Sequence, residues 1–271
     1  MSESKGGGAS VPASRSGTFP PGSRVRSPHQ VPYGLGNAVL ALASRNRGRY
    51  GRPVIALPSE LLEAPELALY AKQIEARLGD ERKRRARFRE ELSPSVKAEF
   101  INGEVFMHSP ATVKHNLARK HLVILLHTYV TVHRLGLVLD EKAMIELTRN
   151  DYEPDINFFG PEKAARLHPD QLLLPPPDFI VEVLSESTER NDRGVKFRDY
   201  AAHDVQEYWL VDPDAEVIEQ FVNRDGHYAL LLKLNTGAIT SRVVQGFTVP
   251  VRAVFDAEEN LAALRKLTQP T

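Results

Sequence analysis

Three residues combine side-chain types and surroundings that suit catalysis. Glu182 lies in the middle of the apolar run 178-DFIVEVLS-185, a pattern that predicts a buried strand. A buried carboxylate is costly to desolvate unless a cation, a metal ion or a raised pKa compensates it. A second acid, Asp155, lies in the similar run 154-PDINFF-159, and Lys196 follows on a predicted helix. Two acids at strand positions and one lysine indicate a metal-dependent site.

The direction of the side chains supports this interpretation. Alternate residues of a strand share a face, so Glu182 points the same way as Ile180 and Leu184. If the two strands are neighbours, Asp155 and Glu182 meet at the edge of the sheet, where their carboxylates repel unless a cation lies between them. A ligand set made only of oxygen atoms selects a hard ion such as Mg²⁺ or Mn²⁺.

The predicted helix over residues 192–203 supplies the third group. Asp192, Lys196 and Tyr200 follow one another at intervals of four residues and therefore share one helical face. On that face, a lysine would orient a metal-bound water or neutralise a phosphate oxygen, while Asp192 and Tyr200 would support it or contact substrate.

Structural roles remain open for each of these residues. Asp155 follows Pro154 and can simply begin its strand, whereas Glu182 and Lys196 can form a buried ion pair and nothing more. A lysine on a helix is also commonly solvated.

Two further residues are weaker candidates. Glu104 follows the Asn102-Gly103 turn signal and is either an extra metal ligand or a cross-strand partner. His115 opens a long predicted helix and either contacts substrate or caps and packs that helix.

The remaining pattern predicts the elements that position these side chains. In chain order they are a helix from Ser59 to residue 91, a hairpin over 97–109, a helix over 111–136 that stops at Gly136, strands around 137–147, 154–159 and 178–185, the helix over 192–203, a strand over 207–213, a hairpin over 216–234 and a helix over 257–267. This order predicts an α/β architecture, a mixed sheet flanked by helices. We expect three parts: a basic tail (1–58), a charged helix (59–93) and a globular domain (94–271).

Composition narrows the class of protein. The chain has 271 residues and no cysteine, which excludes disulfides and thiolate metal sites and fits a cytoplasmic protein. No apolar run is long enough for a transmembrane helix, so we expect no membrane association.

The net charge of zero hides an asymmetry. Residues 1–53 contain eight basic residues and one acidic residue, with abundant Gly, Ser and Pro, a composition typical of disorder. A disordered tail, a nucleic-acid-binding arm and an organelle presequence remain open for this segment, although it has no amphipathic pattern. The charged run 80-DERKRRARFREE-91 is either a solvated helix face or a basic patch for phosphates.

The run 178-DFIVEVLSESTERNDRGVKFRDYAAHDVQEYWLVDP-213 resembles the Uma2 family, which is assigned to the PD-(D/E)XK nuclease superfamily with a restriction-endonuclease-like fold. The hairpin 99-EFINGEVFMHSP-110, the start of the helix at His115 and 154-PDINFF-159 match the same pattern in the same order. The resemblance covers roughly residues 95–255.

The resemblance implies roles for the candidate residues. Asp155 takes the place of the PD aspartate, and Glu182 that of the acid in the (D/E)XK element. The lysine of that element is missing, because Leu184 occupies its position, and Lys196 on the following helix is the implied replacement. The implied activity is that of an endonuclease that hydrolyses phosphodiester bonds with Mg²⁺. DNA is the expected substrate, and a homodimer is the expected assembly. The alternative is a non-catalytic nucleic-acid-binding or assembly module that keeps the fold.

Overall fold

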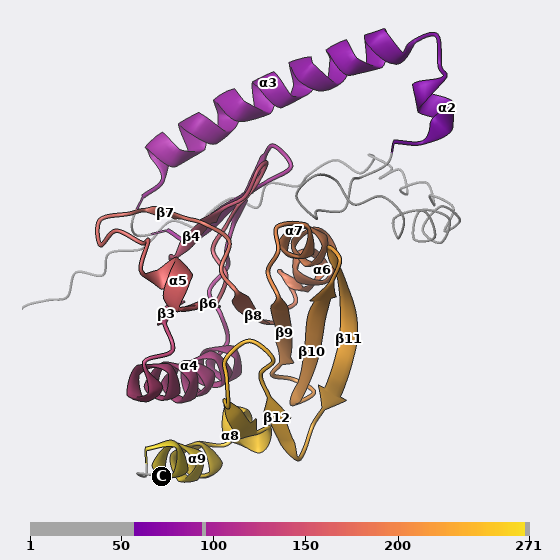
Figure 1. The fold of residues 1–271 in the computed structure, drawn as a ribbon. Helices are drawn as coiled ribbons and strands as arrows, with labels where there is room; N and C mark the ends of the chain where they lie inside the picture. Colours follow the sequence, from indigo (N-terminus) through magenta and orange to yellow (C-terminus); the bar gives the residue numbers. More distant parts are fainter. Residues whose placement is uncertain (1–56, 94–95, 269–271) are drawn as a thin grey trace, which may run out of the picture. The chain divides into compact units, whose positions relative to one another are not determined.

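The computed structural model describes residues 57–93 and 96–268 (Figure 1). The predicted basic tail over 1–58 lies outside the described residues, except for its last two positions.

Within the described part of the chain, most strands belong to two sheets. The first has the order β2 (Glu104–Met107), β1 (Ala98–Ile101), β5 (Asp151–Tyr152), β4 (Met144–Glu146) and β7 (Leu173–Leu174). The second has the order β11 (His227–Leu234), β10 (Val217–Arg224), β9 (Glu207–Asp212), β8 (Phe179–Val183), β6 (Ile156–Phe159) and β3 (Leu137–Asp140). β12 (Ala238–Thr240) pairs with β13 (Thr248–Pro250). Both larger sheets are mixed, because β4 runs parallel to β7 and β8 runs parallel to β9.

Helices accompany these sheets (Figure 1). They are α2 (Ser59–Leu62), α3 (Leu67–Glu91), α4 (Val113–His133), α5 (Pro161–Ala164), α6 (Glu189–Asn191), a π-helical turn (Asp192–Lys196), α7 (Phe197–Ala202), α8 (Arg252–Phe255) and α9 (Ala257–Leu267). The predicted α/β fold, a mixed sheet flanked by helices, is confirmed.

The two faces of β8 lie in different cores. Val181 and Val183 pack with residues of α4, α8 and α9, whereas Ile180 and Leu184 pack with α7 and residues of the first sheet. This division is the one that the alternation of the strand predicts. Glu182 belongs to the second face and therefore points into the layer between β8 and α7.

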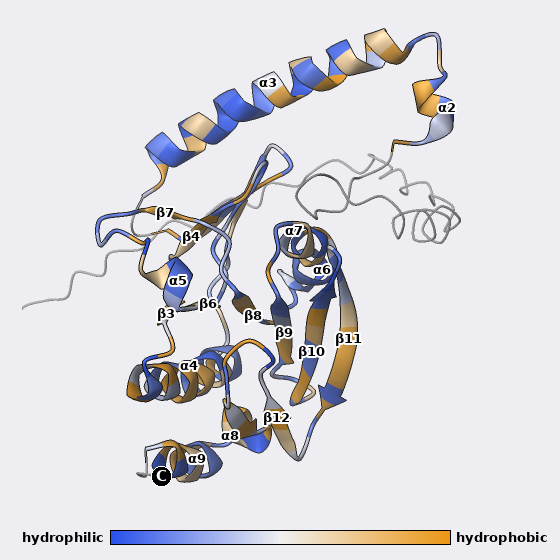
Figure 2. Cartoon of the chain, in the orientation of Figure 1, coloured by the Kyte–Doolittle hydropathy of each residue, from blue (hydrophilic) through white to orange (hydrophobic). Residues whose placement is uncertain are grey.

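The C-terminal half of α3 is attached to the first sheet largely through charged side chains, and Figure 2 shows this half as largely hydrophilic. Arg85 and Arg89 both donate to the carboxylate of Asp151, which has no exposed surface. Nearby, the ring of Phe88 packs on Phe100 with the centroids 5.8 Å apart. This part of the charged run is therefore a docked face and not a solvated one.

Glu81 makes the second attachment of α3. It accepts from Arg149 at 2.7 and 2.8 Å and from Arg77 at 3.1 Å. Its side chain is 3% exposed, so these guanidinium groups replace the water that the carboxylate loses.

Three predicted boundaries are wrong. The helix expected from Ser59 to residue 91 is interrupted around Pro65, which lacks an N–H and disfavours helical geometry at the preceding residue. The strand expected over 137–147 is divided into β3 and β4 by Glu141 and Lys142, both at positive φ. α4 ends before Gly136, because Arg134 already adopts the left-handed conformation.

None of the helices in the described ranges has the length and apolar character needed to cross a membrane.

Candidate active site

The candidate site lies where the chain passes from one sheet to the other. β5 belongs to the first sheet and β6 to the second, and residues 153–155 connect them. β6 runs antiparallel to β8 with Asn157 opposite Ile180. This register places Asp155, just before β6, beside Glu182 on β8.

The structure brings these two acids together by direct contacts. The backbone N–H of Asp155 points to Glu182 Oε2 at 3.4 Å, and the N–H of Val183 donates to Asp155 Oδ2 at 2.9 Å. Asp155 is 4% and Glu182 is 3% exposed, so both carboxylates depend on protein partners.

Lys196 supplies the central cation of the buried cluster. Its Nζ lies 3.0 Å from Glu182 Oε1 and 3.1 Å from Asp192 Oδ1. It also lies 2.8 Å from Oε1 of Glu99. The Tyr200 hydroxyl donates to Glu182 Oε1 at 3.0 Å. Of the three residues predicted on one helical face, Lys196 and Tyr200 contact Glu182, and Asp192 contacts Lys196, which is 1% exposed.

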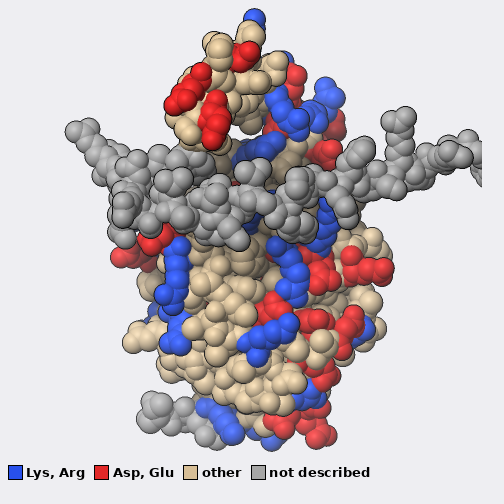
Figure 3. Space-filling model, turned by 90° about the vertical axis from the view of Figure 1, so that its right-hand side faces the viewer, with Lys and Arg blue, Asp and Glu red and all other residues tan. Residues whose placement is uncertain are grey.

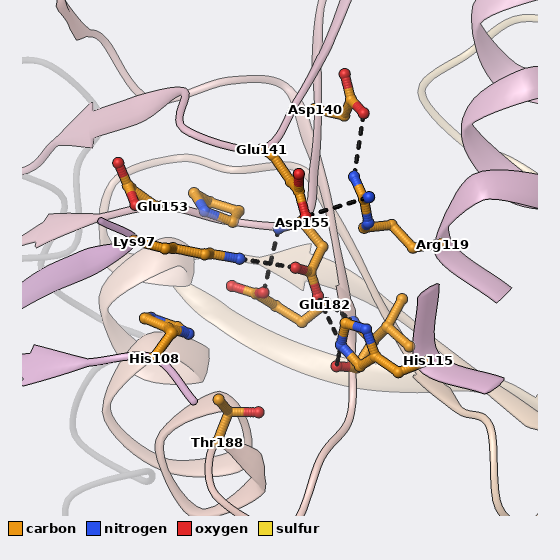
Figure 4. Close-up of polar contacts among 12 residues, drawn as sticks. Lys97, His108, His115, Arg119, Asp140, Glu141, Glu153, Asp155, Glu182 and Thr188 are labelled. Atoms are coloured by element: carbon orange, nitrogen blue, oxygen red, sulfur yellow. Dashed lines mark hydrogen bonds and ion pairs between the residues drawn. The ribbon is translucent and has the colours of Figure 1, made fainter. Parts of the chain in front are cut away.

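Sequence reasoning missed Lys97 and Glu99, which enter the site from β1 and the residue before it. Lys97 Nζ lies 2.9 Å from Asp155 Oδ1, a contact drawn in Figure 4. The signal was the alternation in 97-KAEFI-101, where Ala98 and Phe100 pack toward α3 and the charged Lys97 and Glu99, at the alternate positions, face the other way. Glu153 was missed as well, and its carboxylate accepts the Ala98 N–H at 3.2 Å.

Two histidines complete the polar lining. His108 Nε2 lies 3.3 Å from Glu99 Oε2. His115 Nε2 lies 2.9 Å from the carbonyl oxygen of Val183 and 3.7 Å from Asp155 Oδ2. His115 also lies in the first turn of α4, where Thr112 Oγ1 accepts its backbone N–H. Its side chain therefore belongs to the site while its backbone takes part in the helix cap.

These groups line a cavity of about 840 Å³. Asp155, Glu182, Lys97 and both histidines contribute to its wall, together with the segment 185–188 after β8. The cavity is large enough for a nucleotide unit and has carboxylates and cations at its base.

The chain matches the model of the Uma2 family, described as "Putative restriction endonuclease", over residues 84–252, which is more than half of its length. The chain belongs to the Uma2 family. No curated protein matches it.

A solved structure extends this comparison to the fold of the Uma2 chain. It is described as "a putative nuclease belonging to DUF820 from Anabaena variabilis" and superposes with a TM-score of 0.55. The match covers 65% of this chain and 96% of that one at 16% sequence identity. At this identity it shows that the folds are similar and nothing about function. The family match begins at residue 84, inside α3, and so includes its docked C-terminal turns.

The Uma2 site holds more acids than bases. Its carboxylates are those of Glu99, Glu153, Asp155, Glu182 and Asp192, and its lysines are Lys97 and Lys196. Burial outweighs the opposing charge of Lys196 and, together with the neighbouring acids Asp192, Asp155 and Glu99, raises the pKa of Glu182 to about 8. Burial likewise raises the pKa of Asp192 and Glu153.

Neighbouring basic side chains lower the pKa of the other two acids, Asp155 and Glu99. Burial would raise the pKa of Asp155, but Lys97 and His115 outweigh it and hold that pKa below its usual value. Burial also opposes ionisation of Glu99, yet Lys196 and His108 lower the pKa of Glu99 to about 2. Acidic side chains therefore outnumber lysines around Glu182, and their pKa values are driven apart.

Glu104 lies apart from this cluster. It is exposed on β2, next to the turn at Gly103, and is not among the residues that line the cavity. Its register partner is Ile101, so no acid or base lies directly across the strand pair.

The residues present suit a divalent ion of the Mg²⁺ type. Among the described residues, no group of three or more His, Asp or Glu side chains is arranged to hold a metal ion by itself. Mg²⁺, however, is usually bound by one or two carboxylates with water and substrate phosphate completing its shell. Asp155 and Glu182 provide such a pair of oxygen donors in a cavity whose lining has more acidic side chains than lysines.

Proposed function

We propose that this Uma2 protein is a nuclease that hydrolyses phosphodiester bonds of DNA with Mg²⁺ or Mn²⁺. The observation that carries the proposal is the pair of buried carboxylates, Asp155 and Glu182, which adjoin each other at the base of a polar cavity. The family description, "Putative restriction endonuclease", supports the same reaction class.

Asp155 and Glu182 would hold the ion, which when bound lowers the pKa of a water molecule and stabilises charge on the phosphate. Lys196 and Tyr200 both contact Glu182 Oε1, so they fix the orientation of that carboxylate. His115 contacts the Val183 carbonyl and so holds the end of β8 in place. Asp192 in turn holds the Lys196 ammonium from one turn earlier.

The test is cleavage of supercoiled plasmid by the purified chain. We expect nicking with Mg²⁺ or Mn²⁺, none with a chelator, and loss of nicking in Glu182→Ala. The matched control is Glu162→Ala on the exposed start of α5, which should nick as the wild type does. Persistent nicking by Glu182→Ala would assign the activity to a contaminant and contradict the proposal.

The second candidate function is a nucleic-acid-binding or assembly module without catalysis. Figure 3 shows Lys and Arg interspersed with Asp and Glu on the face that it presents, where a module binding by charge alone needs a continuous basic surface. The acids that line the cavity also favour metal-dependent catalysis over binding of nucleic acid by charge. The homodimer and the cytoplasmic location stay predictions.

A further inference from the structure

Lys97 and Lys196 occupy different electrostatic positions in the cavity. The Lys196 ammonium contacts carboxylates of Glu99, Glu182 and Asp192 at 2.8 to 3.1 Å. The contact with Glu182 is a hydrogen bond, and those with Glu99 and Asp192 are ion pairs, so three carboxylates surround the ammonium. With its side chain 1% exposed among these carboxylates, Lys196 is poorly placed to reach a substrate.

Lys97 has donors to spare. Among the described residues it contacts one carboxylate, that of Asp155, at 2.9 Å, and its side chain is 20% exposed. Lys97 lines the cavity, and Figure 4 shows its side-chain nitrogen directed at Asp155. Lys97 is thus a cation in contact with one of the two acids that would bind metal, yet accessible from the cavity.

The position at which the (D/E)XK element carries its lysine is occupied by a buried leucine in this chain. Leu184, two residues after Glu182, is buried at 6% exposure and packs in the core beside α7. Of the lysines in the described residues, Lys97 and Lys196 line the cavity. A lysine that faces the scissile phosphate must therefore be one of these two.

We propose that Lys97 is the catalytic cation of this site, donating an N–H to a non-bridging oxygen of the scissile phosphate, whereas Lys196 is a positioning residue for Glu182. This inference rests on the proposed hydrolase function. Lys97 stays protonated throughout, so its contribution is the stabilisation of phosphate charge and not proton transfer.

The test compares Lys97→Met and Lys97→Arg with Lys83→Met, a control on the exposed side of α3. Single-turnover cleavage of plasmid with Mg²⁺ should fall about 100-fold in Lys97→Met, as for loss of one transition-state donor. Lys97→Arg keeps the charge and should recover part of the rate, and Lys83→Met should match the wild type.

A second measurement distinguishes a phosphate contact from a structural effect. Binding of a DNA duplex in Ca²⁺, followed by fluorescence anisotropy at several salt concentrations, should lose about 0.9 from the slope of log affinity against log salt in Lys97→Met. Thermal melting should show that all three variants are folded at the assay temperature, with Lys97→Arg and Lys83→Met within a few degrees of the wild type.

The outcomes separate the two proposals. If the wild type cleaves and Lys97→Met cleaves within threefold of it, the Lys97 assignment is overturned and the hydrolase proposal stands. If the wild type fails to cleave DNA both with Mg²⁺ and with Mn²⁺, the hydrolase proposal is wrong, and so is the catalytic role of Lys97. The salt slope then decides whether Lys97 still contacts phosphate, and an unchanged slope excludes it.

Discussion

The backbone N–H of Asp155 points to Oε2 of Glu182 at 3.4 Å, and the residue after Glu182 returns an N–H to Asp155 Oδ2 at 2.9 Å. Each acid is thus positioned by the strand of the other. A shift of either strand by one residue would turn its acid to the opposite face of the sheet. The register of β6 against β8 therefore fixes the candidate site.

We predict that Lys196→Met destabilises the protein by about 3–5 kcal/mol, because three buried carboxylates lose their shared cation. Urea denaturation followed by circular dichroism measures this loss. The control Lys83→Met removes an exposed pair with Asp80 and should change the free energy of unfolding by less than about 0.5 kcal/mol. A loss below 1 kcal/mol in Lys196→Met would show that the buried cluster relaxes without it.

The sequence predicted the part of the site that depends on local periodicity. Alternation along β8 placed Glu182 with Ile180 and Leu184, and helical spacing placed Lys196 between Asp192 and Tyr200. These relationships need only the geometry of one strand or one helix.

The parts that were missed depend on contacts between distant segments. Lys97 and Glu99 flank short apolar positions, and their inward direction follows from the pairing of β1 with β5 and from the packing of α3. The docked face of α3 could not be predicted for the same reason, because Asp151 lies more than 60 residues from Arg85 and Arg89 in the sequence. Local patterns do not specify such pairings.

The attachment of α3 to the first sheet gives a second prediction. Asp151→Asn removes the carboxylate that Arg85 and Arg89 share and leaves two guanidinium groups beside a buried amide. We expect the free energy of unfolding to fall by about 3 kcal/mol, measured by urea denaturation. Asp170→Asn, at a side chain that is 93% exposed, is the matched control and should be neutral. Equal stability of the two variants would mean that the pairs with Asp151 contribute nothing.

Glu81 makes stability depend on acidity. Hydrogen bonds from Arg149 and Arg77 outweigh burial and lower the pKa of Glu81 from 4.5 to about 2. A carboxyl group with a lowered pKa stabilises the fold above pH 4.5 and loses that contribution as the pH falls through about 2. The loss should be about 1–2 kcal/mol, since Arg77 and Arg149 reach solvent.

The measurement for Glu81 is the urea midpoint at pH 5 and pH 2.5. The wild type should lose more stability over this interval than Glu81→Gln, which cannot titrate at that position. Parallel losses in the two proteins would place the acid sensitivity at other carboxylates.

Gly136 gives a prediction about backbone geometry. It adopts φ +137°, and a Cβ at this position would lie 2.1 Å from the carbonyl oxygen of Phe159. Gly136→Ala should therefore cost about 2–4 kcal/mol and lower the melting temperature. Gly194→Ala, where a Cβ would meet nothing within 4 Å, should change stability by less than about 1 kcal/mol. A Gly136→Ala protein as stable as Gly194→Ala would contradict the close approach of β3 and β6.

The most direct test of the proposed site is calorimetric titration with Mn²⁺ of the wild type, Asp155→Asn, Glu182→Gln and Glu104→Gln. We expect the wild type and Glu104→Gln to bind alike, since Glu104 lies outside the cavity. Asp155→Asn and Glu182→Gln should each bind at least about 10-fold more weakly. If the wild type binds no Mn²⁺, or if both of these variants bind it as the wild type does, Asp155 and Glu182 do not form a metal site and the hydrolase proposal is wrong.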